Sequence, residues 1–525
     1  MIPYVSFSFF IIFFGITFFL YSLLPAKTKW ISLLAGSYAF YFVSARGHIY
    51  ALVLSSFVIW ADGWLLQYLD DKMKLSAKEV SGENSRTIGR RYQTYRKCVL
   101  IFGVLTVLSL LFICKYSNFF LSTISRIIPI ERKEVSIVQP LGISFFILEG
   151  ISYIADVYLG KIRAEKNPLR VSLYLSFMLT VVEGPFARYD QLGSQLNKGV
   201  GPDIESINKG ALRIMWGLFK KVVIADRAAM LVNAVFDNYE SYSGIAAAAS
   251  VVFYTLQLYC EFSGIMDIVS GMGSMLGIRL PDNFRQPFFA RSINEFWQRW
   301  HITLGEWLRD YVFYGVLFSK KIKLLSAKAR GTLSPYYANI LPVSIALFFV
   351  WLANGTWHGA GWKYIAYGMY YYLLMTAGMF LEPLFKVICE RLRIDRNSRG
   401  FGIFRMIRTI VIVNIGMLIF RAKDLGTAFY MLKSIFTGID LSVLVPGYGN
   451  GFFLSIYDYT VIILGSVLLL SVSILTENGE DIKDRIYRLP YPGKVILYSA
   501  FLFVIIIFGA YGKEYVVVDM IYANF

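Results

Sequence analysis

Runs of about 20 mostly apolar residues recur along almost the whole chain, and they constrain its fold more than any other feature. The first run covers 4–24 and the last covers 495–510. A helix needs about 20 such residues to cross a bilayer, and roughly a dozen candidates meet this criterion. Lipid offers the backbone no hydrogen-bonding partners, so spanning runs of this length are helical. We therefore predict an all-α, polytopic integral membrane protein with roughly a dozen membrane-embedded helices.

The composition agrees with lipid as the main solvent. Of the 525 residues, 56% are hydrophobic and 17% are charged, with a mean hydropathy of +0.54, which is too apolar for soluble globular domains. The net charge of +17 comes from Lys and Arg in short loops between apolar runs. This distribution indicates orientation by the positive-inside rule, and we expect no nucleic-acid partner.

The basic loops also predict a topology. The strongest loop, 72–97, is expected in the cytoplasm, which places the amino terminus outside. The last run then leaves the cytoplasm after the basic stretch 483–494, so the tail 511–525 is expected outside as well. No internal repeat is visible, and we interpret 1–525 as one membrane domain.

Two of the three histidines lie beside tryptophans in apolar stretches. His358 lies in "ANGTWHGAGW", where Gly359 and Gly361 allow close backbone approach and Asn354 shares its face if the helix is continuous. Ionisable residues at membrane depth usually face a cavity or pathway, and histidine exchanges protons near neutrality. A structural histidine at a helix end remains the alternative.

His301 lies in a second aromatic segment, 292–315. The spacing predicts one continuous helix at the interface or beside a cavity, with Trp297 and Gly305 stacked above and below His301. We interpret His301 as a channel-lining candidate, with interfacial packing as the alternative. His48, in a short loop, receives no role. The cysteines are widely spaced without a C-x-x-C pair, so we expect no metal site.

Several stretches, in this order, resemble the membrane-bound O-acyltransferase family. The similarity is greatest to the bacterial branch that contains the membrane subunit for alginate O-acetylation and the D-alanyl transfer protein of teichoic acid. It is carried by "PLGISFFILEGISYIADVYLGKI", "EGPFARYDQL", "GLFKKVVIAD", "YTLQLYCEFSGIMDIVSGMGSMLGIRLPDNFRQPF", "FWQRWHITLGEWLRDYV", "NGTWHGAGW" and "IFRAKDLGTAFYMLKSIF".

The resemblance implies a helical fold around a central tunnel. Its motif-dense core covers about 140–365, followed by carboxy-terminal helices and the tail in 403–525. It implies that His358 is catalytic and that His301 lies near the tunnel. The expected tunnel- or substrate-lining residues are Asn354, Asn283, Asp282, Trp297, Trp300 and Trp357.

The resemblance also implies an activity. A small acyl group, here expected to be acetyl, would pass from a cytoplasmic donor to hydroxyls of a polysaccharide or cell-wall polymer outside the bacterial cytoplasmic membrane. The donor would be acetyl-CoA or an acyl carrier protein thioester, with no tightly bound cofactor, and an extracytoplasmic acyltransferase partner would complete the transfer. D-alanyl transfer to teichoic acid, a transporter and a non-catalytic membrane scaffold are the alternatives.

The tail "DMIYANF" resembles the hydrophobic-Tyr-x-x-Phe ending that this branch links to acyl relay. This resemblance implies that Tyr522 accepts the acyl group. A phenol with a pKa near 10 is a poor nucleophile until a base takes its proton, and His358 is the candidate base. An aromatic anchor at the outer interface is the alternative for this tail.

Overall fold

The computed structural model describes residues 2–79, 83–128, 137–437, 454–511 and 515. Within these ranges the regular structure is helical, apart from one isolated bridge between Phe284 and Trp300. The all-α prediction is therefore confirmed. The chain groups into two compact units, one with the described residues of 1–211 and 269–281, the other with those of 212–268 and 282–518.

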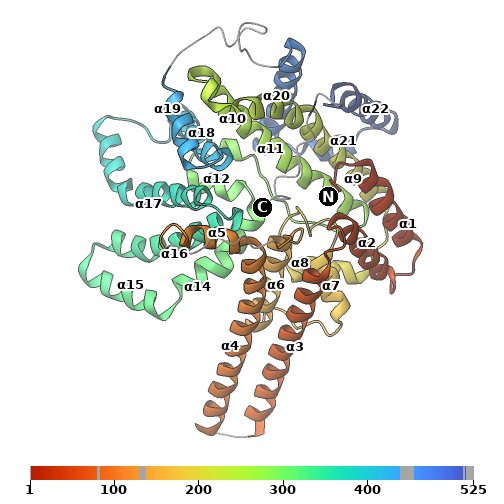
Figure 1. Ribbon diagram of the computed structural model, residues 1–525, viewed down its shortest axis with the longest axis vertical. Helices are drawn as coiled ribbons and strands as arrows, with labels where there is room; N and C mark the ends of the chain where they lie inside the picture. The colour runs from red at the N-terminus through yellow and green to blue at the C-terminus, as the bar shows by residue number, and fades with distance from the viewer. Residues whose placement is uncertain (1, 80–82, 129–136, 438–453, 512–514, 516–525) are drawn as a thin grey trace. The chain divides into compact units, whose positions relative to one another are not determined.

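A long helical hairpin dominates the first unit (Figure 1). It pairs α3 (Tyr50–Glu79) with α4 (Glu83–Leu111), and α6 (Ile143–Tyr158) packs against both. Nearly every side chain of α6 is buried, so this short helix lies inside the unit. The unit also contains η1 (Phe9–Gly15), α1 (Ile16–Leu23), α2 (Lys29–Ser44), η2 (Phe112–Tyr116), α5 (Ser117–Ile124), α7 (Pro168–Ser176), α8 (Tyr189–Lys198) and the start of α9 (Ile204–Leu218).

A second hairpin, α16 (Pro335–His358) and α17 (Trp362–Arg391), organises the other unit (Figure 1). Glycines let the two helices approach closely: a Cβ on Gly368 would lie 2.3 Å from the carbonyl oxygen of Trp351. Helix α16 is continuous through Asn354 and ends at His358, because Gly359 turns to an extended conformation. These glycines place the end of α16 against α17.

Other helices of the second unit bring distant parts of the chain around this hairpin. They are the end of α9, η3 (Phe219–Ala225), α10 (Asp226–Asp237), η4 (Tyr239–Ser241), most of α11 (Gly244–Met275), η5 (Pro287–Phe289), α12 (Ile293–Arg299), α13 (Ile302–Leu308), η6 (Arg309–Phe313), α14 (Tyr314–Leu317), α15 (Lys320–Thr332), α18 (Arg399–Arg421), α19 (Leu425–Ser434), α20 (Ile456–Glu477), α21 (Ile482–Tyr487) and α22 (Tyr491–Phe508).

Eight helices in the described part of the chain are long and apolar enough to cross a membrane. They are Tyr50–Ser76, Asn84–Ile124, Gly244–Met275, Pro335–His358, Trp362–Arg391, Arg399–Arg421, Ile456–Glu477 and Tyr491–Phe508. The expected number of roughly a dozen is not confirmed. Some apolar runs form shorter helices: Phe9–Leu23 has fewer than 18 residues, and α6 has 16.

Candidate functional site

The segment around His301 is not the continuous helix that its aromatic spacing predicts. Helix α12 ends at Arg299, Trp300 is extended, and His301 has a left-handed backbone (φ 49°) before α13 begins at Ile302. The prediction of one helix over 292–315, with Trp297 and Gly305 stacked on His301, is therefore wrong.

The break has a non-local cause. The amide N–H of Arg285 donates to the carbonyl of Arg299 at 2.9 Å, and that of Ile302 donates to the carbonyl of Asn283 at 3.0 Å. These bonds, on either side of the bridge between Phe284 and Trp300, use backbone groups that a continuous helix would bond internally. Helical periodicity cannot reveal a partner from another segment.

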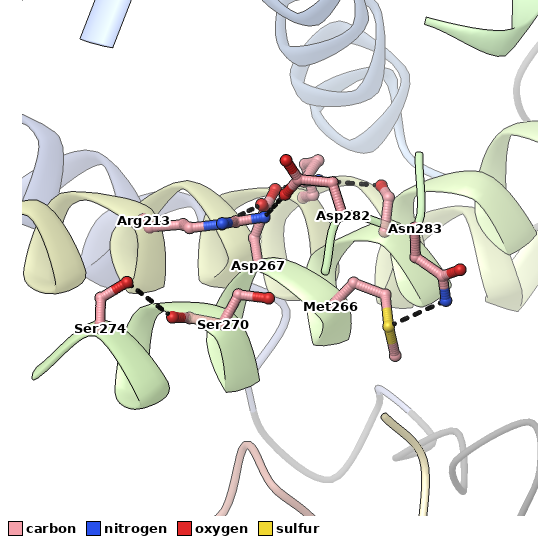
Figure 2. Close-up of polar contacts among 9 residues, drawn as sticks. Arg213, Met266, Asp267, Ser270, Ser274, Asp282 and Asn283 are labelled. Atoms are coloured by element: carbon pink, nitrogen blue, oxygen red, sulfur yellow. Dashed lines mark hydrogen bonds and ion pairs between the residues drawn. The ribbon is translucent and has the colours of Figure 1, made fainter. Parts of the chain in front are cut away.

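Asn283 is the side chain that ties this break together. Its Oδ1 accepts from the backbone N–H of Thr303 at 3.1 Å and from the Thr303 hydroxyl at 2.9 Å, and it lies 3.2 Å from Nδ1 of His301. Its Nδ2 donates to the sulfur of Met266 at 3.2 Å, as Figure 2 shows. Two expected lining residues, Asn283 and His301, are thus in direct contact.

His301 is enclosed by aromatic rings. Only 3% of its surface is exposed, and its ring meets Phe262 edge-on at 4.8 Å between centroids and Trp357 at 5.9 Å. Burial lowers the pKa of His301 to about 3, because desolvation disfavours the charged form. His301 is therefore a neutral imidazole near neutral pH.

His358 also contacts the Trp357 ring. The centroids of Trp357 and His358 are 4.8 Å apart, and Tyr367 and Phe420 meet the His358 ring edge-on at 5.7 and 5.2 Å. His358 is 4% exposed. The fold thus brings together His301, Trp357 and His358. Of the expected catalytic residues, only His358 lies in the described part of the chain, and aromatic rings enclose it.

A cavity of about 360 Å³, the aromatic cavity, lies beside this cluster. Its lining includes Trp297, Trp300, His301, Trp351 and Asn354. Four of the residues expected to line a tunnel or substrate site therefore share one cavity. Asn354 is 5% exposed and lies one helical turn before His358 on α16.

A second cavity of about 520 Å³, the charged cavity, adjoins the same break in the chain. Its lining includes Asn283 and these charged residues: Arg213, Lys220, Asp267, Asp282, Arg285, Arg299, Glu477 and Lys483. Basic side chains outnumber carboxylates in this lining, so its field favours anions. Asp282 and Asn283, predicted as lining residues, both lie here.

The charges of this cavity form a network that the sequence analysis missed. Asp267 accepts from Nε of Arg213 at 2.8 Å and from Nζ of Lys220 at 2.6 Å, while Arg213 also donates to Asp282 (Figure 2). Burial lowers the pKa of Lys220 although Asp267 opposes this effect. The motif "GLFKKVVIAD" contains Lys220 and was the available signal, but its partners lie more than 40 residues away.

Tyr522 lies outside the described residues. Within the described ranges, no group of three or more His, Cys, Asp or Glu side chains is arranged to hold a metal ion.

Comparisons with known proteins assign the family. The model of the MBOAT, membrane-bound O-acyltransferase family, matches residues 161–332. The probable alginate O-acetylase AlgI of Pseudomonas putida is 32% identical over 379 residues, which cover 69% of this chain and 72% of that protein. The peptidoglycan O-acetyltransferase of Helicobacter pylori is 30% identical, covering 65% of each chain.

A more distant relative is named for the transfer of a different acyl group. The teichoic acid D-alanyltransferase of Bacillus subtilis is 26% identical over 295 residues, which cover 55% of this chain and 70% of that protein. With its all-α membrane fold and these relatives, the chain belongs to the membrane-bound O-acyltransferase family and is an O-acyltransferase.

Proposed function

We propose that this protein transfers an acetyl group from a cytoplasmic thioester to hydroxyls of an extracytoplasmic polysaccharide or cell-wall polymer. One observation carries the proposal: two cavities of different character adjoin one buried contact, between His301 and Asn283. His301 lines the aromatic cavity, and Asn283 lines the charged cavity. The names of the alginate and peptidoglycan relatives support acetyl as the group and a polymer as its destination.

The reaction needs a base and a protected site. The hydroxyl oxygen attacks the thioester carbon, the C–S bond breaks, and the thiolate leaves and takes up the proton that the hydroxyl loses. We assign His358 as the base that carries this proton, because histidine is the side chain best suited to exchange protons near neutrality. The rings around His358 keep bulk water away, which limits hydrolysis of the thioester.

The charged cavity supports a donor that carries phosphate. Acetyl-CoA and an acyl carrier protein both present the acyl group on a phosphopantetheine arm, and the basic excess in this cavity is complementary to phosphate. No tightly bound cofactor is required. Because Lys220 is only 3% exposed, we expect its charge to act at the inner part of the cavity, while the exposed Arg285 and Lys483 attract the donor.

The proposal includes an outward relay in the cytoplasmic membrane of a bacterium, with both chain termini outside. In it Tyr522 receives the acetyl group with the help of His358, and an extracytoplasmic acyltransferase moves it to the polymer. Deletion of residues 522–525 is then expected to abolish polymer acetylation. Full retention of acetylation would leave the tail as an aromatic anchor.

A single cellular experiment tests the central claim. In a strain that lacks this gene, the wild-type chain should restore acetate esters that mild alkali releases from the surface polymer. His358→Gln should reduce the acetate esters to the background of the deletion strain. His48→Gln, which changes a histidine outside the proposed site, should not reduce them. Normal acetylation by a fully expressed His358→Gln protein would favour the scaffold interpretation.

D-alanyl transfer is the second candidate, because a relative is named for it. The released group distinguishes the two: acetate supports the main proposal, and D-alanine supports this one. Everted membrane vesicles supplied with labelled acetyl-CoA or with an acetylated carrier protein then identify the donor.

A further inference from the structure

We infer that Asn283 is a positioning residue that holds His301 in the tautomer protonated on Nδ1, which makes Nε2 the proton-accepting atom of that ring. The arrangement of the hydrogen bonds carries this inference, independently of any activity. Its consequence for catalysis rests on the proposed function.

The orientation of the Asn283 amide follows from an unambiguous donor. The backbone N–H of Thr303 can only donate, and it points to the Asn283 atom 3.1 Å away, so that atom must be the oxygen. The opposite end of the amide then carries the NH₂ group, which faces an acceptor, the sulfur of Met266 at 3.2 Å (Figure 2). Both ends of the amide are satisfied in this orientation alone.

The tautomer of His301 follows from that orientation. An amide oxygen can only accept, and it lies 3.2 Å from Nδ1 of His301. Nδ1 must therefore carry a hydrogen, since two lone pairs would otherwise face each other in a buried contact. Burial, which lowers the pKa of His301 to about 3, keeps the second nitrogen unprotonated near neutral pH.

The backbone prevents the ring from escaping this contact. The carbonyl of Asn283 accepts from the N–H of Ile302, and its side chain accepts from the N–H of Thr303, so Asn283 satisfies two donors in the first turn of α13. His301 is the residue before that turn and has φ 49°, a conformation that is costly for a residue with a Cβ. Asn283 thus fixes the histidine through backbone and side chain together.

The consequence is a directed hydrogen-bond acceptor beside the aromatic cavity. His301 lines that cavity, and Nε2 is the ring atom that can accept a hydrogen bond from a hydroxyl or thiol of a bound ligand. With the opposite tautomer the ring would offer a donor at Nε2 and could not take up a proton there. Asn283 therefore determines which chemistry His301 can perform.

Nitrogen NMR measures the tautomer directly. The chain has only three histidines, so selective ¹⁵N-histidine labelling of the full protein in lipid gives three rings, which His48→Gln and His358→Gln assign. We expect the His301 ring to show a protonated Nδ1 and an unprotonated Nε2 at pH 7. A ring protonated on Nε2, or on both nitrogens, would overturn the inference.

Three variants separate positioning from simple packing. Asn283→Leu, similar in size, should release the tautomer, whereas Asn283→Asp retains acceptor oxygens and should keep Nδ1 protonated. Thr303→Val removes the other side-chain partner of the same oxygen and should leave the His301 signals unchanged. If Asn283→Leu folds and its His301 signals match those of wild type, Asn283 does not set the tautomer; if it does not fold, Asn283→Asp and the wild-type spectrum still decide the question.

Activity tests the catalytic consequence separately. We expect Asn283→Leu to lower acyl transfer by about tenfold or more, and Thr303→Val to change it by less than about threefold. A released tautomer with unchanged transfer would refute the positioning role. Absence of acyl transfer by the wild-type protein would refute the proposed function instead, while the NMR result would stand on its own.

Discussion

Arg213 donates from Nε to Oδ1 of Asp267 at 2.8 Å, and this bond joins α9 to α11 within the second unit (Figure 2). Both side chains are largely buried, with 20% and 16% of their surfaces exposed. A carboxylate in such a place is stable only while it is paired, because its desolvation must be offset by nearby charge and hydrogen bonds. The pair therefore stabilises the wall of the charged cavity.

Arg213→Met is expected to lower the free energy of unfolding by about 2 kcal/mol, since it removes one of the two cations that balance Asp267. Asp282→Asn should cost less than about 0.5 kcal/mol, because Asp282 is 68% exposed and water screens its charge. Thermal and denaturant unfolding of both variants in the same detergent measures the difference. If both variants lose the same free energy of unfolding, the pairing of Arg213 with Asp267 does not stabilise the cavity wall.

Gly368→Ala is expected to destabilise the α16–α17 hairpin by about 1 to 3 kcal/mol, because the added Cβ would lie 2.3 Å from the carbonyl oxygen of Trp351. The same substitution at Gly378, also on α17, meets nothing within 4 Å and should be neutral or slightly stabilising. The pair controls for helix propensity, and unfolding temperature is the readout. We also expect reduced acyl transfer from Gly368→Ala, because His358 ends α16.

His301 is expected to make the protein less stable in acid. Its folded-state pKa of about 3 lies below the ordinary value of 6.5, so between these values the unfolded chain binds the proton that the folded chain excludes. This contribution to stability is complete above pH 6.5 and decreases as the pH falls towards 3. At pH 5 the loss should be about 2 kcal/mol relative to pH 7.5.

His301→Gln provides the control for that pH effect. Because glutamine does not titrate, the variant should lose less stability than wild type between pH 7.5 and pH 5. The comparison between the two proteins removes the contributions of the other titrating groups. Parallel stability curves for wild type and variant would contradict the buried, neutral state of His301.

Arg227→Met is expected to lower the free energy of unfolding by about 3 kcal/mol. Arg227 is 1% exposed, forms an ion pair with Asp458, and donates to the carbonyl of Phe508 at 2.9 Å. Its loss would leave Asp458 without this cation. Arg309→Met, which changes a side chain that is 51% exposed, should cost less than about 0.5 kcal/mol in the same unfolding assay.

Several features of the site could be predicted from the sequence because their signals are local. His301 and His358 are recognisable as ionisable side chains beside tryptophans in apolar stretches. The shared face of Asn354 and His358 follows from helical spacing on α16. The contacts of Arg213 and Lys220 with Asp267 could not be predicted, because they join residues from different helices. Residue spacing along one helix contains no information about such pairs.

The break at His301 shows the same limit. The aromatic stripe correctly indicates that helix forms on both sides, in α12 and α13, but it cannot show that the segment at Asn283 takes over the hydrogen bonds between them. A backbone donor bonds to the acceptor that the folded chain brings nearest. That competition is decided only when both segments are in place.

The sequence alone determined that lipid is the main solvent of this chain and that its structure is helical, because apolar run length and unsatisfied backbone groups leave no other spanning form. It also indicated which histidines lie in apolar surroundings. Only the tertiary structure decided that Trp357 contacts both His301 and His358, and that Asn283 contacts His301. Packing and hydrogen bonding between distant segments set these relationships, and they exist only in the folded chain.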